Sequence, residues 1–207
     1  MIDCSSILPT ARPDDIAGEL EGRVYFSNEV SPNNPGFLSL DAQPFFRAML
    51  AAVVSPKVKQ IVLCSGAQLG KSTFLNLAAL SALKWRPGSC LWLLPTDTMA
   101  KRAVKKRLLP LIQCNPEFAA FLPFGQVSFA DCIPLRGFPV YYSGVKQAHK
   151  LAERPANMVI MDEAAKYGRG HQDEADPISL AKERTKSFAG SLIVMASTPN
   201  TEENKFW

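Results

Sequence analysis

Two stretches of this 207-residue chain carry residues whose types and order could bind and hydrolyse a nucleoside triphosphate. The first, residues 65–73, follows the apolar run 61–64. In a phosphate-binding (Walker A) loop, backbone N–H groups surround the β-phosphate and the next helix adds the positive end of its dipole. Lys71 would reach the β- and γ-phosphates, and Ser72 would bind Mg²⁺. The pattern predicts an ATP site made of Ser65, Gly66, Ala67, Gln68, Leu69, Gly70, Lys71, Ser72 and Thr73.

This loop departs from the usual pattern at its first position, where Ser65 replaces glycine and Gly66 follows. Gly66 can still supply the backbone freedom that the loop needs. A Gly-Lys-Ser/Thr triplet alone should occur by chance in roughly one chain in ten of this length, so an ordinary strand-to-helix turn is the alternative. The apolar strand before the loop and the helical pattern after it favour the phosphate loop.

The second stretch is the apolar run 158–161, which leads directly into Asp162 and Glu163. Open parallel sheets bind ligands at the carboxyl ends of their strands, where this pair would lie. Asp162 would hold Mg²⁺, and Glu163 would orient and deprotonate the water that attacks the γ-phosphate. The alternative is an exposed acidic pair at the start of a helix. Together with the phosphate loop, the pair predicts a Mg²⁺-dependent ATP hydrolase.

A third apolar run, residues 192–196, ends in Ser197, Thr198 and Pro199. Beside the strand of the acidic pair, the two hydroxyls could sense the γ-phosphate. The alternative is a Ser/Thr-Pro turn of the kind common on protein surfaces. We expect this run to lie beside the other two strands, which favours the sensing role.

Short apolar segments and helical segments alternate along most of the chain. The pattern predicts strands at 59–64, 90–94, 127–130, 140–143, 158–161 and 191–196, and helices at 41–54, 71–84, 96–112 and 179–188. This alternation is typical of a parallel sheet covered on both faces. We therefore expect an α/β, doubly wound, mainly parallel P-loop ATPase domain (ASCE/RecA-like) at residues 37–207. Residues 1–36, rich in proline, serine and asparagine, would form an irregular arm.

Composition excludes several other classes of protein. Apolar residues make up 47% and charged residues 20%, which argues against a wholly disordered chain. The longest apolar run, residues 48–54, is too short for a membrane span, and the N-terminus lacks the layout of a signal peptide. Five scattered cysteines without a CxxC pair argue against a zinc site or a disulfide framework.

The order of these motifs resembles the N-terminal packaging ATPase of tailed-phage terminase large subunits, in the subgroup typified by phage lambda. The resemblance spans residues 22–207 and is most specific at residues 91–97, which read Leu-Trp-Leu-Leu-Pro-Thr-Asp, and at 151–163. It implies a motor that hydrolyses ATP to drive double-stranded DNA into a procapsid. It also implies a homo-oligomeric ring on the portal protein, a small terminase subunit that delivers DNA, and a location in the host cytoplasm. A nuclease domain would follow Trp207 in the full-length protein.

The resemblance also suggests roles for three further residues. Some terminase loops carry an arginine where this chain has Ala67, so we expect the arginine finger, worth about 10³ to 10⁵ in rate, elsewhere. Arg154 and Arg184 are the candidates, in their own subunit or toward a neighbour, and the alternative for each is a solvated helix face. Gln43 resembles a glutamine that contacts adenine, although it could simply lie at the start of a helix.

Five cations fall within residues 101–107, a segment that we expect to be helical. Lys and Arg suffice to neutralise DNA phosphates, so this helix is the candidate contact with double-stranded DNA, with a solvated helix face as the alternative. Two other functions stay open. A helicase-like ATPase that remodels nucleic acid shares all three motifs, and a nucleotide-binding assembly module would need no Glu163.

Overall fold

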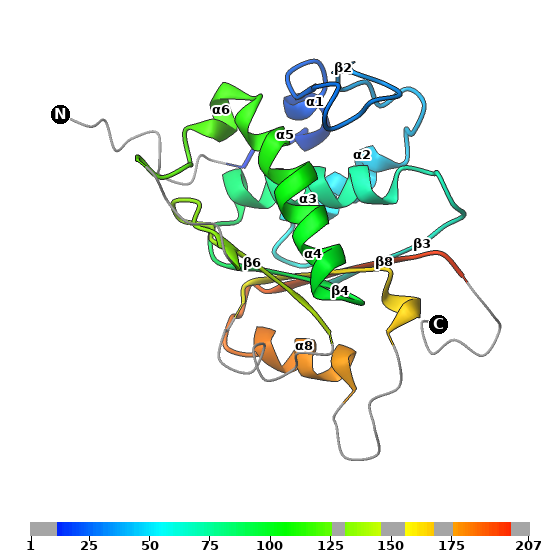
Figure 1. Ribbon diagram of the computed structural model, residues 1–207, viewed down its shortest axis with the longest axis vertical. Coiled ribbons are helices and arrows are strands. Elements are labelled where there is room, and N and C mark those ends of the chain that lie inside the picture. Colours follow the sequence, from blue (N-terminus) through cyan, green and yellow to red (C-terminus); the bar gives the residue numbers. More distant parts are fainter. Residues whose placement is uncertain (1–11, 126–130, 146–155, 168–175, 200–207) are drawn as a thin grey trace.

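Six strands form one sheet in the described part of the chain, which comprises residues 12–125, 131–145, 156–167 and 176–199 of a computed structural model (Figure 1). Five strands are parallel, and β5 pairs antiparallel with β6 at one edge. The spatial order is β3 (Gln60–Cys64), β8 (Leu192–Ser197), β7 (Met158–Asp162), β4 (Cys90–Leu94), β6 (Val140–Gly144) and β5 (Cys132–Ile133). The predicted α/β fold with a mainly parallel, doubly wound sheet is confirmed.

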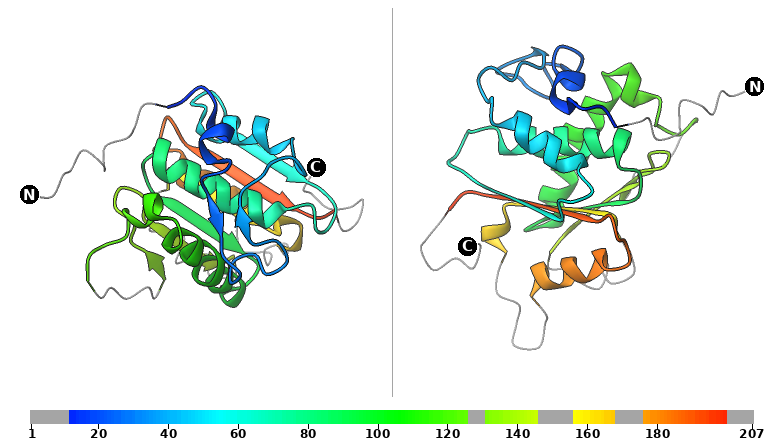
Figure 2. Two further views of the ribbon diagram at one scale, coloured as in Figure 1. Left: turned by 90° about the horizontal axis from the view of Figure 1, so that it is seen from above. Right: turned by 180° about the vertical axis from the view of Figure 1, so that it is seen from behind.

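The central strands are apolar throughout because both faces of the sheet are covered. Every residue of β4, β7 and β8 is buried, whereas the edge strand β3 leaves Val62 45% exposed. On one face, Trp92, Ile160 and Val194 join a core shared with α2 (Phe46–Val54) and α3 (Lys71–Trp85). The alternate residues of the same strands pack with Ala181 of α8 (Pro177–Thr185) on the other face. Figures 1 and 2 show α8 on its own side of the sheet.

Helix α3 connects the first strand to this core. Its residues 74–83 are all buried, because α2 packs along it and the sheet lies beneath it. Such a helix, apolar on all sides, is typical of the interior of a layered domain. The helix that begins directly after the candidate phosphate loop is therefore held rigidly in the centre of the protein.

The basic segment is a single continuous helical rod with an irregular middle. It consists of α4 (Asp97–Ala103), the π-helix η2 (Val104–Leu108) and α5 (Leu109–Gln113). Asp97 fixes its start, since its carboxylate accepts a 2.7 Å hydrogen bond from the backbone N–H of Gly144 at the end of β6. The predicted helix at 96–112 was correct in extent, but its sequence pattern did not reveal the π-helical turn.

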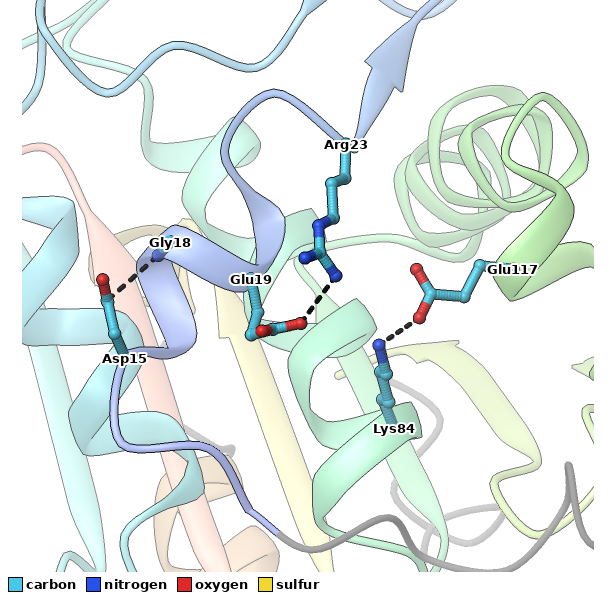
Figure 3. A network of polar contacts seen from close by, with 6 residues as sticks. All are labelled: Asp15, Gly18, Glu19, Arg23, Lys84 and Glu117. Carbon is cyan, nitrogen blue, oxygen red and sulfur yellow. Dashed lines mark hydrogen bonds and ion pairs between the residues drawn. The ribbon is translucent and has the colours of Figure 1, made fainter.

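The segment before α2 is more ordered than the predicted arm. It contains α1 (Ile16–Leu20), β1 (Tyr25–Phe26) and β2 (Gly36–Phe37), and both Ile16 and Leu20 are 1% exposed. Elements this short give little periodicity to recognise. Asp15 caps α1 through a 3.0 Å hydrogen bond from the N–H of Gly18, as Figure 3 shows. The domain boundary at residues 36 and 37 stays a prediction.

A few polar contacts hold the surface helices near α1 (Figure 3). Arg23 pairs with Glu19, and Lys84 of α3 pairs with Glu117 of α6 (Pro116–Ala119). These pairs lie at the opposite end of α3 from Lys71, so they stabilise the scaffold rather than the site. The predicted strand at 127–130 lies outside the described residues. No helix in the described part of the chain is long and apolar enough to cross a membrane.

Candidate nucleotide site

Residues 65–70 form the turn between β3 and α3, where the sequence predicts a phosphate loop. Gly70 adopts φ +79°, and the helix begins with a 2.8 Å hydrogen bond from the N–H of Phe74 to its carbonyl. A Cβ at Gly70 would lie 3.1 Å from the ring of Phe46. Both the left-handed conformation and this close approach explain why glycine occupies the position.

Lys71 folds back over this loop from the first turn of α3. Its ammonium donates hydrogen bonds to the carbonyls of Ser65, at 3.0 Å, and Gly66, at 2.5 Å. The charge is thereby placed inside the curve of the loop, beside the backbone that would surround a phosphate. The first turn of α3 then presents the hydroxyls of Ser72 and Thr73 next to it.

Asp162 ends β7 in a buried position and is only 7% exposed. Burial, followed by the charge of Glu163, raises the pKa of Asp162 to about 6. A hydrogen bond from the N–H of Glu163 and the charges of Arg107 and Lys71 act in the opposite direction on that pKa. Both cations are therefore close enough for their charge to act on this carboxylate. A buried carboxylate and a serine hydroxyl are hard oxygen ligands, which suit Mg²⁺ together with nucleotide phosphates.

Glu163 occupies a left-handed backbone conformation, with φ +56°, immediately after β7. For a residue other than glycine this conformation is uncommon, and strain of this kind clusters at functional sites. The side chain forms a 2.7 Å ion pair with Lys166 at the end of the 3₁₀ turn Ala164–Lys166. The turn thus places the second carboxylate beside Lys166, immediately after the buried Asp162.

Strand β8 joins the two motifs because it lies between β3 and β7. The carbonyl of Ser197 accepts a 3.3 Å hydrogen bond from the N–H of Ser65, at the start of the loop. Its hydroxyl accepts a 3.0 Å bond from the N–H of Ala165, in the turn after Glu163. The expectation that this run lies beside the other two strands is confirmed. Ser197 is 2% exposed, so the described role of its hydroxyl is to connect the loop and the acidic turn.

Replacing Ser197 with alanine should lower the free energy of unfolding by about 1–3 kcal/mol, because the partly buried N–H of Ala165 would lose its acceptor. The measurement is the midpoint of urea unfolding at unchanged slope. Thr198→Ala is the matched control, since its half-exposed side chain should contribute less than about 0.5 kcal/mol. Equal shifts for the two variants would show that Ser197 does not connect the motifs.

A pocket of about 530 Å³ opens beside the first turn of α3. Three walls enclose it: α3, the rod of α4 and η2, and the segment that follows β1. The lining residues are Ser72, Thr73 and Asn76, then Arg102, Lys106 and Arg107, and finally Phe26, Glu29, Val30, Ser31 and Pro32. Three cations of the predicted DNA-contact helix thus lie in one pocket with the hydroxyls that follow Lys71.

The model of the family described as phage terminase large subunit gpA, ATPase domain, matches residues 32–207. The chain belongs to this family of terminase ATPase domains. The resemblance noted from the motifs is confirmed, and membership makes the domain a nucleotide-binding ATP hydrolase. It also favours a terminase over the helicase-like alternative.

Solved structures of terminases share this fold at low sequence identity. The large terminase of bacteriophage HK97 is similar with a TM-score of 0.64 and 13% identity, over 88% of this chain and 37% of that one. The large terminase ATPase domain of Thermus phage P74-26 gives a TM-score of 0.57 and 20% identity, over 79% of this chain and 66% of that one. This chain therefore spans little more than a third of the HK97 terminase. No curated protein sequence is significantly similar to it.

Gln43 lies beside residues 65–70 of the candidate phosphate loop, although it precedes Gly70 by 27 positions in the sequence. Its side-chain Cδ is 3.8 Å from where a Cβ on Gly70 would stand, and Phe46 of the same segment is closer still. Packing of α2 against α3 brings the two together. A contact between Gln43 and adenine stays a prediction.

The structure describes only one of the two candidates for the arginine finger. Arg154 lies outside the described residues. Arg184 lies in α8, and its carbonyl accepts a 3.2 Å hydrogen bond from the N–H of Ala156, just before β7 begins. It therefore lies at the amino edge of the sheet, opposite the edge that carries Asp162 and Ser197. If Arg184 acts as a finger, this position requires it to act on a neighbouring subunit.

Sequence reasoning missed the direction in which the basic helix presents its side chains. The five cations were assigned together to DNA, yet Arg102, Lys106 and Arg107 line the pocket and Lys101 and Lys105 are not among its lining residues. The helical spacing of the apolar residues could have indicated which cations share a face of the helix. The π-helical turn changes that spacing after Ala103. Only the packed structure separates the two sets.

Proposed function

We propose that this chain is the ATPase motor domain of a phage terminase, which uses ATP hydrolysis to translocate double-stranded DNA into a procapsid. The observation that carries this proposal is the placement of β8. It holds the candidate phosphate loop and the Asp162–Glu163 pair at one edge of the sheet through two hydrogen bonds of Ser197. Family membership supplies the packaging context.

At this site different residues of the chain would have different roles in hydrolysis. The loop and Lys71 would bind the β- and γ-phosphates, while Ser72 and Asp162 would hold Mg²⁺. Bound there, Mg²⁺ would neutralise charge on the phosphate oxygens. Glu163 would orient the attacking water and accept its proton. Gln43 would contact adenine. Ser197 and Thr198 would sense the γ-phosphate.

The proposed partners follow from the terminase family and from charge. A ring of identical subunits on the portal protein, with a small terminase subunit delivering DNA, would allow Arg184 or Arg154 to act on the next subunit's nucleotide. The portal of the procapsid in the host cytoplasm would be the place of action. The DNA contact would come from Lys101 and Lys105, which do not line the pocket.

The test measures ATP turnover by this chain with double-stranded and with single-stranded DNA. A packaging motor should be stimulated by the duplex, whereas a helicase-like ATPase should respond to single strands and unwind duplexes. Stimulation by single strands alone would overturn packaging. Turnover that responds to neither form of DNA would overturn translocation by this chain.

Replacing both Lys101 and Lys105 with alanine should weaken binding to duplex DNA and lower the slope of log affinity against log salt concentration. Each lost phosphate contact reduces that slope by about 0.9, so the pair should remove about 1.8. Titration of a fluorescent duplex at several salt concentrations measures the slope. Lys57→Ala removes an exposed charge elsewhere and should leave the slope unchanged. An unchanged slope in the double variant would exclude these two lysines as DNA contacts.

A further inference from the structure

The pocket beside α3 combines two kinds of phosphate-binding group from different parts of the chain. Ser72 and Thr73 contribute hydroxyls from the turn that carries Lys71, and Arg102, Lys106 and Arg107 contribute positive charge from the neighbouring rod. Within residues 65–73, Lys71 is the sole cation. The rod therefore adds charge that the loop lacks.

The π-helical turn explains why Arg107 in particular points into this pocket. In an uninterrupted α-helix, Arg107 would lie one turn after the buried Ala103, on the core side. In η2, the N–H of Leu109 bonds instead to the carbonyl of Val104, five residues earlier. Leu108, 1% exposed, takes the core position and Arg107 is left on the side of the pocket. Single π-helical turns inside α-helices occur frequently at functional sites.

One further observation distinguishes Arg107 from the other cations of the rod. Its charge acts on Asp162, as does that of Lys71, so it lies near the carboxylate at the end of β7. None of the ion pairs among the described residues involves a cation of the rod, and Arg107 shares this property with the other four. Arg107 thus lines one pocket with the hydroxyls of α3 and is close enough to the acidic strand end for its charge to act on Asp162.

We propose that Arg107 binds the γ-phosphate of ATP in its own subunit and stabilises the charge that develops there during hydrolysis. This inference rests on the proposed ATPase function. In the step, the water oxygen bonds to the γ-phosphorus, the bond to the β,γ-bridging oxygen breaks, and Glu163 takes the proton of the water. ADP and phosphate leave, and Arg107 donates to the equatorial oxygens throughout. The assignment differs from both Arg154 and Arg184.

The experiment compares the affinities of ATPγS and ADP, each with Mg²⁺, in the unaltered chain and in Arg107→Ala. Because only ATPγS carries the γ-phosphate, we expect its Kd to rise about 10- to 100-fold and that of ADP to change less than about threefold. ATP turnover should fall about 10²- to 10³-fold. The ratio of the two Kd values within one variant is independent of the fraction that is folded, so partial unfolding cannot mimic the result.

Two further variants serve as controls for this experiment. Arg23→Ala removes an exposed arginine whose partner is Glu19, far from the loop, and should change neither the ratio nor turnover. Arg107→Lys keeps the charge without the planar fork and should recover part of the discrimination. Arg107→Gln, which keeps length and helix propensity, gives the same ratio test if the alanine variant fails to fold.

Three results would overturn the role of Arg107. One is an equal loss of affinity for both nucleotides, and another is an unchanged ratio in every Arg107 variant. The third is a loss of duplex affinity with an unchanged ratio, which would make Arg107 a DNA contact. Failure of the proposed function is a separate result, because the unaltered chain would then neither bind nor hydrolyse ATP.

Discussion

Glu163→Gln should reduce ATP turnover by about 10²- to 10⁴-fold while MgATP still binds. Glutamine has nearly the same size and can still hold the water, but it cannot accept the proton. The charge of Glu163 contributes to the raised pKa of Asp162. Removing that charge lowers the pKa of Asp162, so the carboxylate stays ionised to a lower pH and Mg²⁺ binding is not weakened. Single-turnover hydrolysis and equilibrium binding of ATP measure the two effects separately.

Lys166→Ala is the matched control for this result. It breaks the 2.7 Å ion pair with Glu163 but leaves the carboxylate in place. Because half-exposed ion pairs contribute about 0–1 kcal/mol, turnover should change by no more than a few fold. Comparable losses in both variants would assign the defect to the position of the turn rather than to proton transfer. Full turnover in Glu163→Gln would mean that another group is the base.

Lys71→Ala should weaken MgATP binding about 10- to 100-fold. The ammonium lies inside the loop on the carbonyls of Ser65 and Gly66, where it would meet the phosphates. Hydrogen bonds to charged groups contribute about 1.5–3 kcal/mol, and 1.4 kcal/mol corresponds to a factor of ten in affinity. The loss also removes a charge that lowers the pKa of Asp162, so protonation of Asp162 would begin at a higher pH and compete with Mg²⁺.

Isothermal titration with MgATP at pH 7 and pH 8 measures this second effect. At pH 8 Asp162 should be ionised in both proteins, so the variant should recover part of its deficit there. Lys57→Ala, which removes an exposed lysine outside the loop, should bind as the unaltered chain does. Unchanged affinity in Lys71→Ala would show that residues 65–73 are an ordinary strand-to-helix turn and would remove the basis for the ATP site.

Local sequence pattern predicted most elements of this domain, because each strand and helix carries its own signal. The runs that became β3, β4, β7 and β8 are continuously apolar, since both faces of the sheet are covered. The helix after the loop was predicted within one residue of its end at Trp85. Helix α2 begins at Phe46 rather than near residue 41, because Gln43 and Pro44 lie in the turn before it.

Elements with weak local signals were not predicted. The two residues of β5 are too few to show alternation, and their pairing with β6 depends on contacts between distant segments. The segment of α1 was expected to be irregular, yet Ile16 and Leu20 are buried because the core of α2 and α3 receives them. Five-residue helices are stabilised by such packing far more than by propensity.

The sequence by itself determined the chemistry of this protein: a loop with Lys71 and Ser72, an acidic pair at a strand end, and motifs specific enough to indicate a terminase ATPase. Tertiary structure decided which side chains share the site. Only strand order places Ser197 between the loop and the acidic turn, and puts Arg184 at the far edge of the sheet. Only the packed π-helical turn directs Arg107 into the pocket. The physical reason is that residue type and short-range periodicity are local properties, whereas strand order and rotation about a helix axis depend on the packing of segments far apart in the chain.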